Sequence, residues 1–134
     1  MKLSTKGRYG LKAMYYLAQE NSLLSLKQLS LKAEIPEPYL EKILGILRKE
    51  KLIETTRGSL GGYSLSRPAD EISIGEILRA LEDNLYLAAC NGGKCNSKDC
   101  PSKNIFNRIY KEINDVLDKI YLSDMLESNK KGIN

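Results

Sequence analysis

The first half of the chain begins with a stretch whose apolar residues recur every three or four positions, which predicts an amphipathic helix. This helix starts from a cap at Ser4 or Thr5 and runs to about Glu20. Its expected inward positions are Leu11, Met14, Tyr15, Leu17 and Ala18.

Two further helices follow after short breaks. Ser25 and Gln28 have the spacing of a capping box, which predicts a short helix over residues 26–33 with Leu26, Leu29 and either Leu31 or Ala33 inside. The next helix is expected over residues 38–49, because Pro38 suits the first turn of a helix. Its inward stripe is Leu40, Ile43, Leu44 and Leu47.

Two short strands are predicted directly after these helices. Residues 52–56 form the first strand, residues 57–62 form a glycine-rich turn, and residues 63–65 return as the second strand. Helices followed by such a hairpin are typical of a winged helix–turn–helix, so the expected fold class is mainly α with a small β-wing.

The second half predicts two more helices separated by a loop. Ser73 caps a helix over about residues 74–82, residues 83–101 form the loop, and a long helix continues to about Tyr121, followed by a short turn capped by Ser123. The long helix has its apolar positions at Phe106, Ile109, Ile113, Val116, Leu117 and Ile120. We therefore divide the chain into a winged helix–turn–helix unit (1–67), a linker helix with a three-cysteine loop (68–100), a long C-terminal helix (101–127) and a frayed tail (128–134).

The charge is unevenly distributed between the two halves. Residues 1–67 contain 12 Lys and Arg against six Glu, whereas residues 68–134 contain nine basic against 11 acidic residues. A basic half suggests contact with a polyanion, although a chance excess on a solvated face remains the alternative.

Nucleic-acid contacts are expected from the third helix, from the hairpin and from the start of the first helix. Basic or phenolic side chains there can reach phosphates, and Glu41 can accept a hydrogen bond from cytosine N4, unless it only pairs with a nearby lysine. Arg57 beside glycine suits a narrow minor groove, with a solvent-exposed hairpin tip as the alternative. The candidate residues are Lys6, Arg8, Tyr39, Glu41, Lys42, Arg48, Arg57 and Gly58.

Several protein classes are disfavoured by the sequence. No apolar run approaches the roughly 18 residues of a membrane span, and the N-terminus lacks the apolar region of a secretion signal, so we expect a cytoplasmic protein without membrane contact. The chain has no histidine, no glycine-rich phosphate loop and no paired acidic site, so we expect no enzymatic activity.

Cys90, Cys95 and Cys100 bring three thiols into one loop. An odd number of cysteines without a secretion signal argues against a disulfide framework. Thiolates select zinc, Cu(I) or iron–sulfur clusters, and three free or oxidation-sensing thiols are the metal-free alternative.

Three motifs carry a resemblance to a known family. Residues 5–10 (TKGRYG), 39–41 (YLE) and 57–63 (RGSLGGY) resemble the winged-helix regulators that include the iron–sulfur cluster regulator IscR, the nitric-oxide sensor NsrR and the cysteine-metabolism repressor CymR. The resemblance spans about residues 1–126. It implies a homodimer, joined by the long C-terminal helix, that binds a palindromic operator in double-stranded DNA. It also implies that Glu41 and Lys42 read the major groove and Arg57 the minor groove. One position differs from the family pattern: Pro38 stands where the iron–sulfur regulator has a hydroxyl residue that contacts DNA.

The resemblance also bears on the cysteines. Cluster-binding members have three cysteines here and one further ligand, which implies an iron–sulfur cluster, expected to be [2Fe-2S], on Cys90, Cys95 and Cys100. Their further ligands are replaced here by Lys103 or Arg8. The fourth ligand is therefore left open among Asp99, a loop Asn or Ser, a backbone or solvent group and a small thiol. Control by a partner protein, with an idle cysteine loop, is the alternative, and a zinc-stapled adaptor that does not bind DNA is another.

Overall fold

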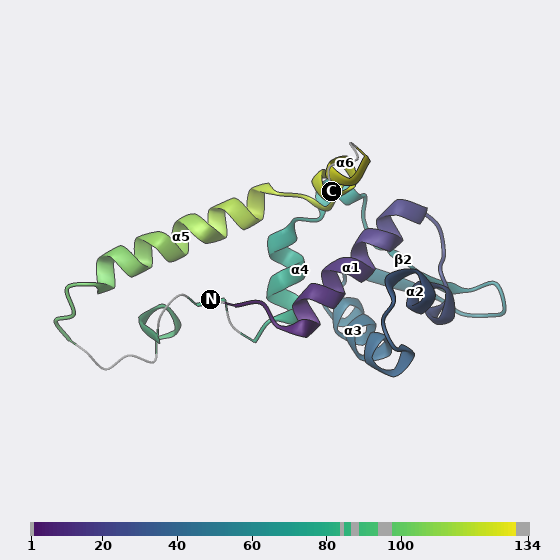
Figure 1. Cartoon of the computed structure of the whole chain (residues 1–134), viewed down its shortest axis with the longest axis horizontal. Helices are drawn as coiled ribbons and strands as arrows, with labels where there is room; N and C mark the ends of the chain where they lie inside the picture. The colour runs from purple at the N-terminus through teal and green to yellow at the C-terminus, as the bar shows by residue number, and fades with distance from the viewer. Residues whose placement is uncertain (1, 84, 87–88, 94–97, 131–134) are drawn as a thin grey trace.

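The structure is a computed structural model that describes residues 2–83, 85–86, 89–93 and 98–130. The described part of the chain is mainly helical, with one pair of strands between its third and fourth α-helices (Figure 1). Its helices and strands are α1 (Thr5–Glu20), α2 (Leu26–Ala33), α3 (Glu37–Lys49), β1 (Ile53–Thr56), β2 (Gly62–Leu65), η1 (Ala69–Glu71), α4 (Ile74–Leu81), η2 (Ala89–Gly92), α5 (Lys103–Lys119) and α6 (Leu122–Lys130), where η marks a short 3₁₀ helix.

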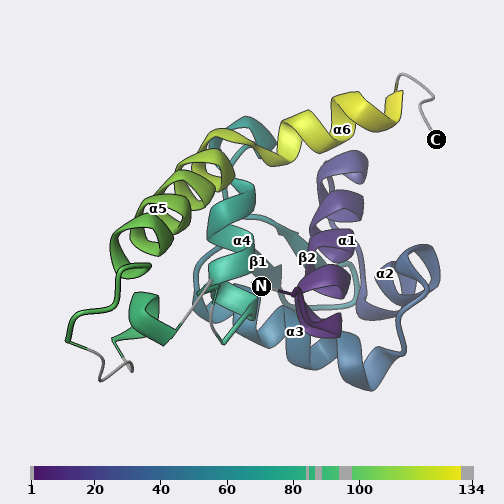
Figure 2. The same cartoon turned by 60° about the vertical axis from the view of Figure 1, so that its left-hand side comes forward.

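Helix α1 lies at the centre of the core and contacts α2, α3, α4, α6 and β2. Figure 2 shows α4 on one side of α1, α3 below it and α6 above its C-terminal end. The whole predicted stripe of α3 is buried, as are Met14, Leu17 and Ala18 of α1. In α2 the predicted Leu29 is buried, and of the two alternatives Ala33 is buried whereas Leu31 is 71% exposed. Apolar burial of this extent explains why short helices are stable here.

Serine caps fix where three helices begin. Ser4 accepts a hydrogen bond from the Gly7 N–H, so Ser4, and not Thr5, caps α1. The predicted capping box of Ser25 and Gln28 is confirmed, and Ser73 forms a second box with Glu76 at the start of α4. Each such cap stabilises a helix by about 1 kcal/mol, because it satisfies backbone N–H groups that lack a partner within the helix.

Helix α3 starts one residue earlier than the sequence indicates. Pro36 is its N-cap, and Pro38 lies inside the first turn, where a missing N–H costs nothing. The helix ends at Lys49, as expected.

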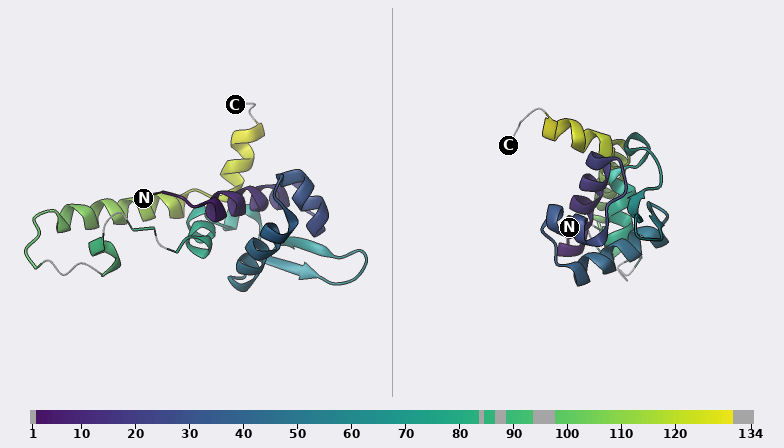
Figure 3. Two further views of the ribbon diagram at one scale, coloured as in Figure 1. Left: turned by 60° about the horizontal axis from the view of Figure 1, so that its bottom comes forward. Right: turned by 90° about the vertical axis from the view of Figure 1, so that its right-hand side faces the viewer.

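The predicted wing is confirmed as an antiparallel pair of strands. Its register pairs Ile53 with Leu65 and Thr56 with Gly62. The hairpin is attached to the helices by an isolated bridge between Leu24 and Tyr63. Because Ile53 is buried, the base of the wing is held in the core, while the loop extends beyond it (Figure 3, left).

Helix α5 projects from this core and is fastened to it along its C-terminal half (Figure 1), where the Arg79 guanidinium of α4 donates to Asn114 at 2.9 Å and to Asp118 at 2.7 Å. The Ile74 N–H donates to the Ile120 carbonyl at 2.7 Å, and the Leu122 N–H donates to the Ile72 carbonyl at 2.9 Å. These bonds hold residues 120–121 extended, so α5 stops at Lys119.

The long helix therefore ends two residues before Tyr121, near its expected end, whereas the expected turn capped by Ser123 is wrong. Helix α6 begins at Leu122, whose side chain is buried, and the Tyr121 N–H donates to the Asp124 carboxylate. Residues 128–130 of the expected tail belong to α6, and residues 131–134 lie outside the described residues. Among the described helices, none is long and apolar enough to cross a membrane.

Candidate nucleic-acid interface

Helix α3 presents a polar face opposite its buried stripe. Glu41, Lys42 and Arg48 are all exposed on it. In the described part of the chain none of them takes part in an ion pair, so the alternative of a Glu41–lysine pair is not observed. A Cβ atom added at Gly45, on the same face, would meet nothing within 4 Å. The centre of this face is therefore bare backbone that another molecule can approach closely.

The loop of the wing exposes Arg57 and Gly58. Gly58 has φ +107°, a conformation that side chains with a Cβ rarely adopt. The Gly61 N–H donates to the Gly58 carbonyl at 3.1 Å and closes a tight turn, and a Cβ at Gly61 would overlap the Thr56 carbonyl. The glycines therefore make the tip thin and set its shape.

The start of α1 carries two more of the predicted residues, Lys6 and Arg8. Lys6 and Tyr39 line one hollow of about 530 Å³, between the first turn of α1 and the end of α4. The ring of Tyr39 packs edge-on against Tyr9, with 5.7 Å between the centroids, and is half-buried. Arg8 is exposed and its guanidinium donates to the Thr5 hydroxyl at 3.3 Å. The structure thus brings Lys6 beside Tyr39 of α3, whereas Arg8 is exposed on α1 and Arg57 and Gly58 lie on the wing.

Glu82 is a residue of this region that the sequence analysis did not single out. One of its carboxylate oxygens accepts from the Ser4 N–H at 2.8 Å and from the Ser4 hydroxyl at 3.0 Å. It thereby ties the end of α4 to the cap of α1, and a Cβ at Gly7 would overlap it. The two partners are 78 residues apart, so no local sequence signal could have revealed the contact.

The linker after the wing is fixed by a partly exposed ion pair. Arg67 lies 2.9 Å from the Glu76 carboxylate and also donates to the Glu71 carbonyl. Burial alone would raise the pKa of Glu76, but hydrogen bonds from the Ser73 N–H and from Arg67, together with the charge of Arg67, outweigh it and lower this pKa. Glu76 is therefore held as a carboxylate that anchors the wing to α4.

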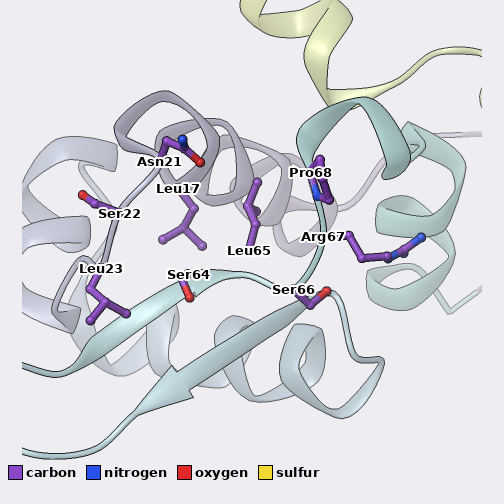
Figure 4. A pocket seen from close by; sticks show the side chains of 9 residues that line it. All are labelled: Leu17, Asn21, Ser22, Leu23, Ser64, Leu65, Ser66, Arg67 and Pro68. Carbon is purple, nitrogen blue, oxygen red and sulfur yellow. The ribbon is translucent and has the colours of Figure 1, made fainter.

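A hollow of about 570 Å³ lies at the base of the wing (Figure 4). It is bounded by the end of α1, the end of β2 and the linker. Arg67 is the one charged side chain of its lining and extends towards α4, where Glu76 binds it (Figure 4). The lining residues are Leu17, Asn21, Ser22, Leu23, Ser64, Leu65, Ser66, Arg67 and Pro68, which contain no carboxylate or thiol for catalysis.

The structure describes only part of the loop that contains the three cysteines. The backbone of Cys90 lies in η2, Cys95 lies outside the described residues, and Cys100 is a free and exposed thiol shortly before α5. No cluster of metal-binding side chains occurs among the described residues. The predicted ligand set therefore stays a prediction.

Comparison with known proteins identifies the family. A profile described as "Rrf2: Iron-dependent Transcriptional regulator" matches residues 3–128. A putative helix–turn–helix transcriptional regulator of Neisseria meningitidis is 36% identical over 137 residues, which cover 98% of this chain and 92% of that protein. The helix–turn–helix transcriptional regulator IscR of Cereibacter sphaeroides is 35% identical over 143 residues, with 98% and 90% covered.

Solved structures show the same fold. IscR from T. potens superposes with a TM-score of 0.81 at 36% identity, over 100% of this chain and 92% of that one. CymR, the global cysteine regulator of B. subtilis, superposes with a TM-score of 0.79 at 34% identity, over 93% and 95% of the two chains. The winged-helix fold class and the family resemblance are thus confirmed, and so is the expectation of a regulator instead of an enzyme. The chain belongs to the Rrf2 family of DNA-binding transcription regulators.

Proposed function

We propose that two copies of this chain pair through α5 and bind a palindromic operator, with each α3 in a major groove and each wing in the adjacent minor groove. The observation that carries the proposal is the polar face of α3, which is exposed and free of ion pairs within the described residues. Helices with this arrangement dock their first turns against base edges. A regulator of this kind acts on chromosomal DNA, so we place it in the cytoplasm.

The exposed residues of α3 divide into base-reading and phosphate-binding roles. Glu41 accepts a hydrogen bond from a cytosine N4 amino group, and Lys42 donates to acceptor atoms of the major groove. Arg48, near the end of α3, binds a phosphate. Lys6 and Arg8 of α1, together with Tyr39 of α3, bind the sugar–phosphate backbone of the DNA. Arg57 enters the minor groove, where a narrow A·T-rich groove concentrates negative potential.

Pairing through α5 is supported by an apolar surface that one chain leaves uncovered. No residue of α5 is buried. Ile105 is 49% exposed, Ile109 is 37% exposed and Val116 is 54% exposed. A helix with a continuous apolar stripe is stable in water only when another surface covers that stripe. A second α5 matches it in length and pattern, and a symmetric pair gives the two-fold axis that a palindrome requires.

The DNA contacts are tested with an operator selected from random duplexes by the purified protein. We expect Arg57→Ala to weaken binding to it about tenfold and to relax the A·T preference beside each half-site, since one good contact is worth about 1–3 kcal/mol. Fluorescence anisotropy measures the affinity, and its slope against salt concentration gives the number of phosphates that the protein contacts. Unchanged affinity in Arg57→Ala and in Lys42→Ala would contradict the docking.

We further propose that the cysteine loop binds an iron–sulfur cluster, expected to be [2Fe-2S], through Cys90, Cys95 and Cys100. The donor set fits, because three thiolates are the ligands such clusters prefer and supply three of the usual four. The description of the matching family as iron-dependent supports the same choice. When bound, such a cluster gains or loses electrons and responds to iron supply and oxidation.

The described ends of the loop connect it to both functional parts. On one side, the Asn91 amide donates to Asn107 of α5 at 2.7 Å, and the Tyr86 ring lies 5.8 Å from that of Tyr110. On the other side, Glu82 binds Ser4 at the cap of α1. Ordering the loop around a cluster would therefore act on the dimer helix and on the start of α1 together.

Iron and sulfide analysis of protein purified without oxygen tests the cluster. We expect both elements with a charge-transfer absorption spectrum, and we expect Cys95→Ala to lose them while its sedimentation stays that of a dimer. A colourless protein without iron would contradict the cluster and favour control by thiol oxidation or by a partner protein. Equal operator affinity of holo and apo protein would contradict the coupling.

A further inference from the structure

Leu60 is the most exposed large apolar side chain of the described residues, at 90% exposure. It lies in the wing loop between Ser59 and Gly61, three residues after Arg57. The nearest part of the core, at Ile53, is at the opposite end of the hairpin. Packing within the described residues does not hold Leu60 there, so its side chain is free to contact another molecule.

The backbone of the loop places Leu60 in an exposed turn. The bond from the Gly61 N–H to the Gly58 carbonyl makes Ser59 and Leu60 the central residues of a tight turn. Gly58 and Gly61 cannot be replaced by larger residues without strain or overlap, so the turn has a set shape. The loop projects from the body (Figure 3, left), and Arg57 directly precedes the turn that has Leu60 as its second central residue.

We propose that Leu60 is a second minor-groove contact of the wing, which packs against deoxyribose and the groove floor while Arg57 supplies the charge. The inference rests on the docking of the wing described under the proposed function. Duplex DNA is the occupant favoured by the adjacent arginine, because a cation beside an apolar tip matches a groove with negative potential and apolar sugar walls.

Such a contact also distinguishes base pairs. The guanine N2 amino group is the one donor on the floor of the minor groove, and A·T pairs lack it. A leucine pressed against this amino group would leave it without a hydrogen-bond partner, which is unfavourable. Leu60 thus disfavours G·C pairs at the positions that the wing covers, independently of the major-groove contacts of α3.

The first test compares Leu60→Ala with a matched control. Leu31 is the other strongly exposed leucine, at 71%, and lies on α2 outside the wing, so Leu31→Ala controls for the loss of an exposed leucine. We expect Leu60→Ala to weaken operator binding about tenfold, in line with burial of one leucine side chain. The slope of affinity against salt should stay unchanged, whereas Arg57→Ala should reduce it. Leu60→Met should retain the affinity, because it keeps the apolar volume.

The second test replaces guanine by inosine in the flank under the wing, which removes the N2 amino group and leaves the major groove unaltered. Wild-type protein should bind the inosine flank more tightly than the guanine flank, and Leu60→Ala should lose most of that difference.

If Arg57→Ala weakens operator binding while Leu60→Ala binds as tightly as Leu31→Ala, the role of Leu60 is refuted and the wing docking stands. If neither wing variant weakens binding, the wing docking itself fails. Loss of regulation with intact DNA affinity would instead assign Leu60 to a protein contact and overturn the proposal.

Discussion

The winged-helix unit and helix α5 are both amphipathic, yet only the first covers its apolar residues within one chain. Helix α3 buries all four residues of its stripe, whereas α5, which is longer, buries none. The same sequence signal thus has two outcomes, because periodicity shows that a face needs covering but does not show which molecule covers it. Leu85 and Leu122 complete the core of the winged-helix unit, whereas the apolar stripe of α5 is left uncovered, as the proposed pairing with a second chain requires.

Removing a core side chain of the winged-helix unit should have the largest effect. Leu44 is fully buried, and we expect Leu44→Ala to lower the free energy of unfolding by about 2–5 kcal/mol, because the lost contacts leave a cavity. Chemical denaturation measures this loss. The exposed Leu31→Ala should stay within about 0.5 kcal/mol of wild type. Equal losses in the two variants would mean that the core is assigned wrongly.

Placing a charge on the uncovered face of α5 should break the dimer without unfolding the winged-helix unit. We expect Ile109→Glu to weaken self-association by about a hundredfold, since a buried unpaired charge costs several kcal/mol. Analytical ultracentrifugation measures the association, and circular dichroism checks the helices. Lys111→Ala, on the charged side of the same helix, is the control. A dimer that survives in Ile109→Glu would require an interface elsewhere.

The contact that links α4 to α1 should have a smaller effect. Glu82→Ala removes both acceptor contacts to Ser4, and we expect a loss of about 1 kcal/mol together with faster hydrogen exchange at the first turn of α1. Asp83→Ala is the matched control, because it removes the same charge one residue further on. The same exchange rates in both variants would show that Glu82 does not hold this turn.

The smallest effect is expected in the dependence of stability on pH. The pKa of Glu76 is lowered in the folded chain, so its contribution is complete above its ordinary value of 4.5 and is lost as the pH falls through the folded value. Glu76→Gln should therefore unfold with a flatter pH profile below about pH 5. Glu71→Gln, at a neighbouring exposed carboxylate, should keep the wild-type profile. Identical profiles for Glu76→Gln and wild type would contradict the assigned shift.

Local signals made much of the winged-helix unit predictable. Helix α2 has the bounds that its capping box predicts, and the stripe of α3 was placed correctly, since caps and periodicity are properties of neighbouring residues. The start of α3 was placed one residue late, because Pro36 and Pro38 both fit a helix start.

Contacts between segments that are distant in the chain cannot be predicted from local sequence signals. The break between α5 and α6 depends on the pairing of Ile72 with Leu122, and the contact of Glu82 with Ser4 joins the end of α4 to the start of α1. The candidate DNA-contact residues were found from charge and position, and the structure exposes Glu41, Lys42, Arg48 and Arg57, while their roles stay predictions. The exposed Leu60 could have been noticed as the one apolar residue of a glycine-rich turn.

The stoichiometry of the complex with operator DNA tests the central claim most directly. Sedimentation equilibrium of the protein with a duplex that carries the complete palindrome should give two chains per duplex, and a duplex with a single half-site should bind far more weakly. One chain per duplex, with equal affinity for the half-site and the palindrome, would contradict the account.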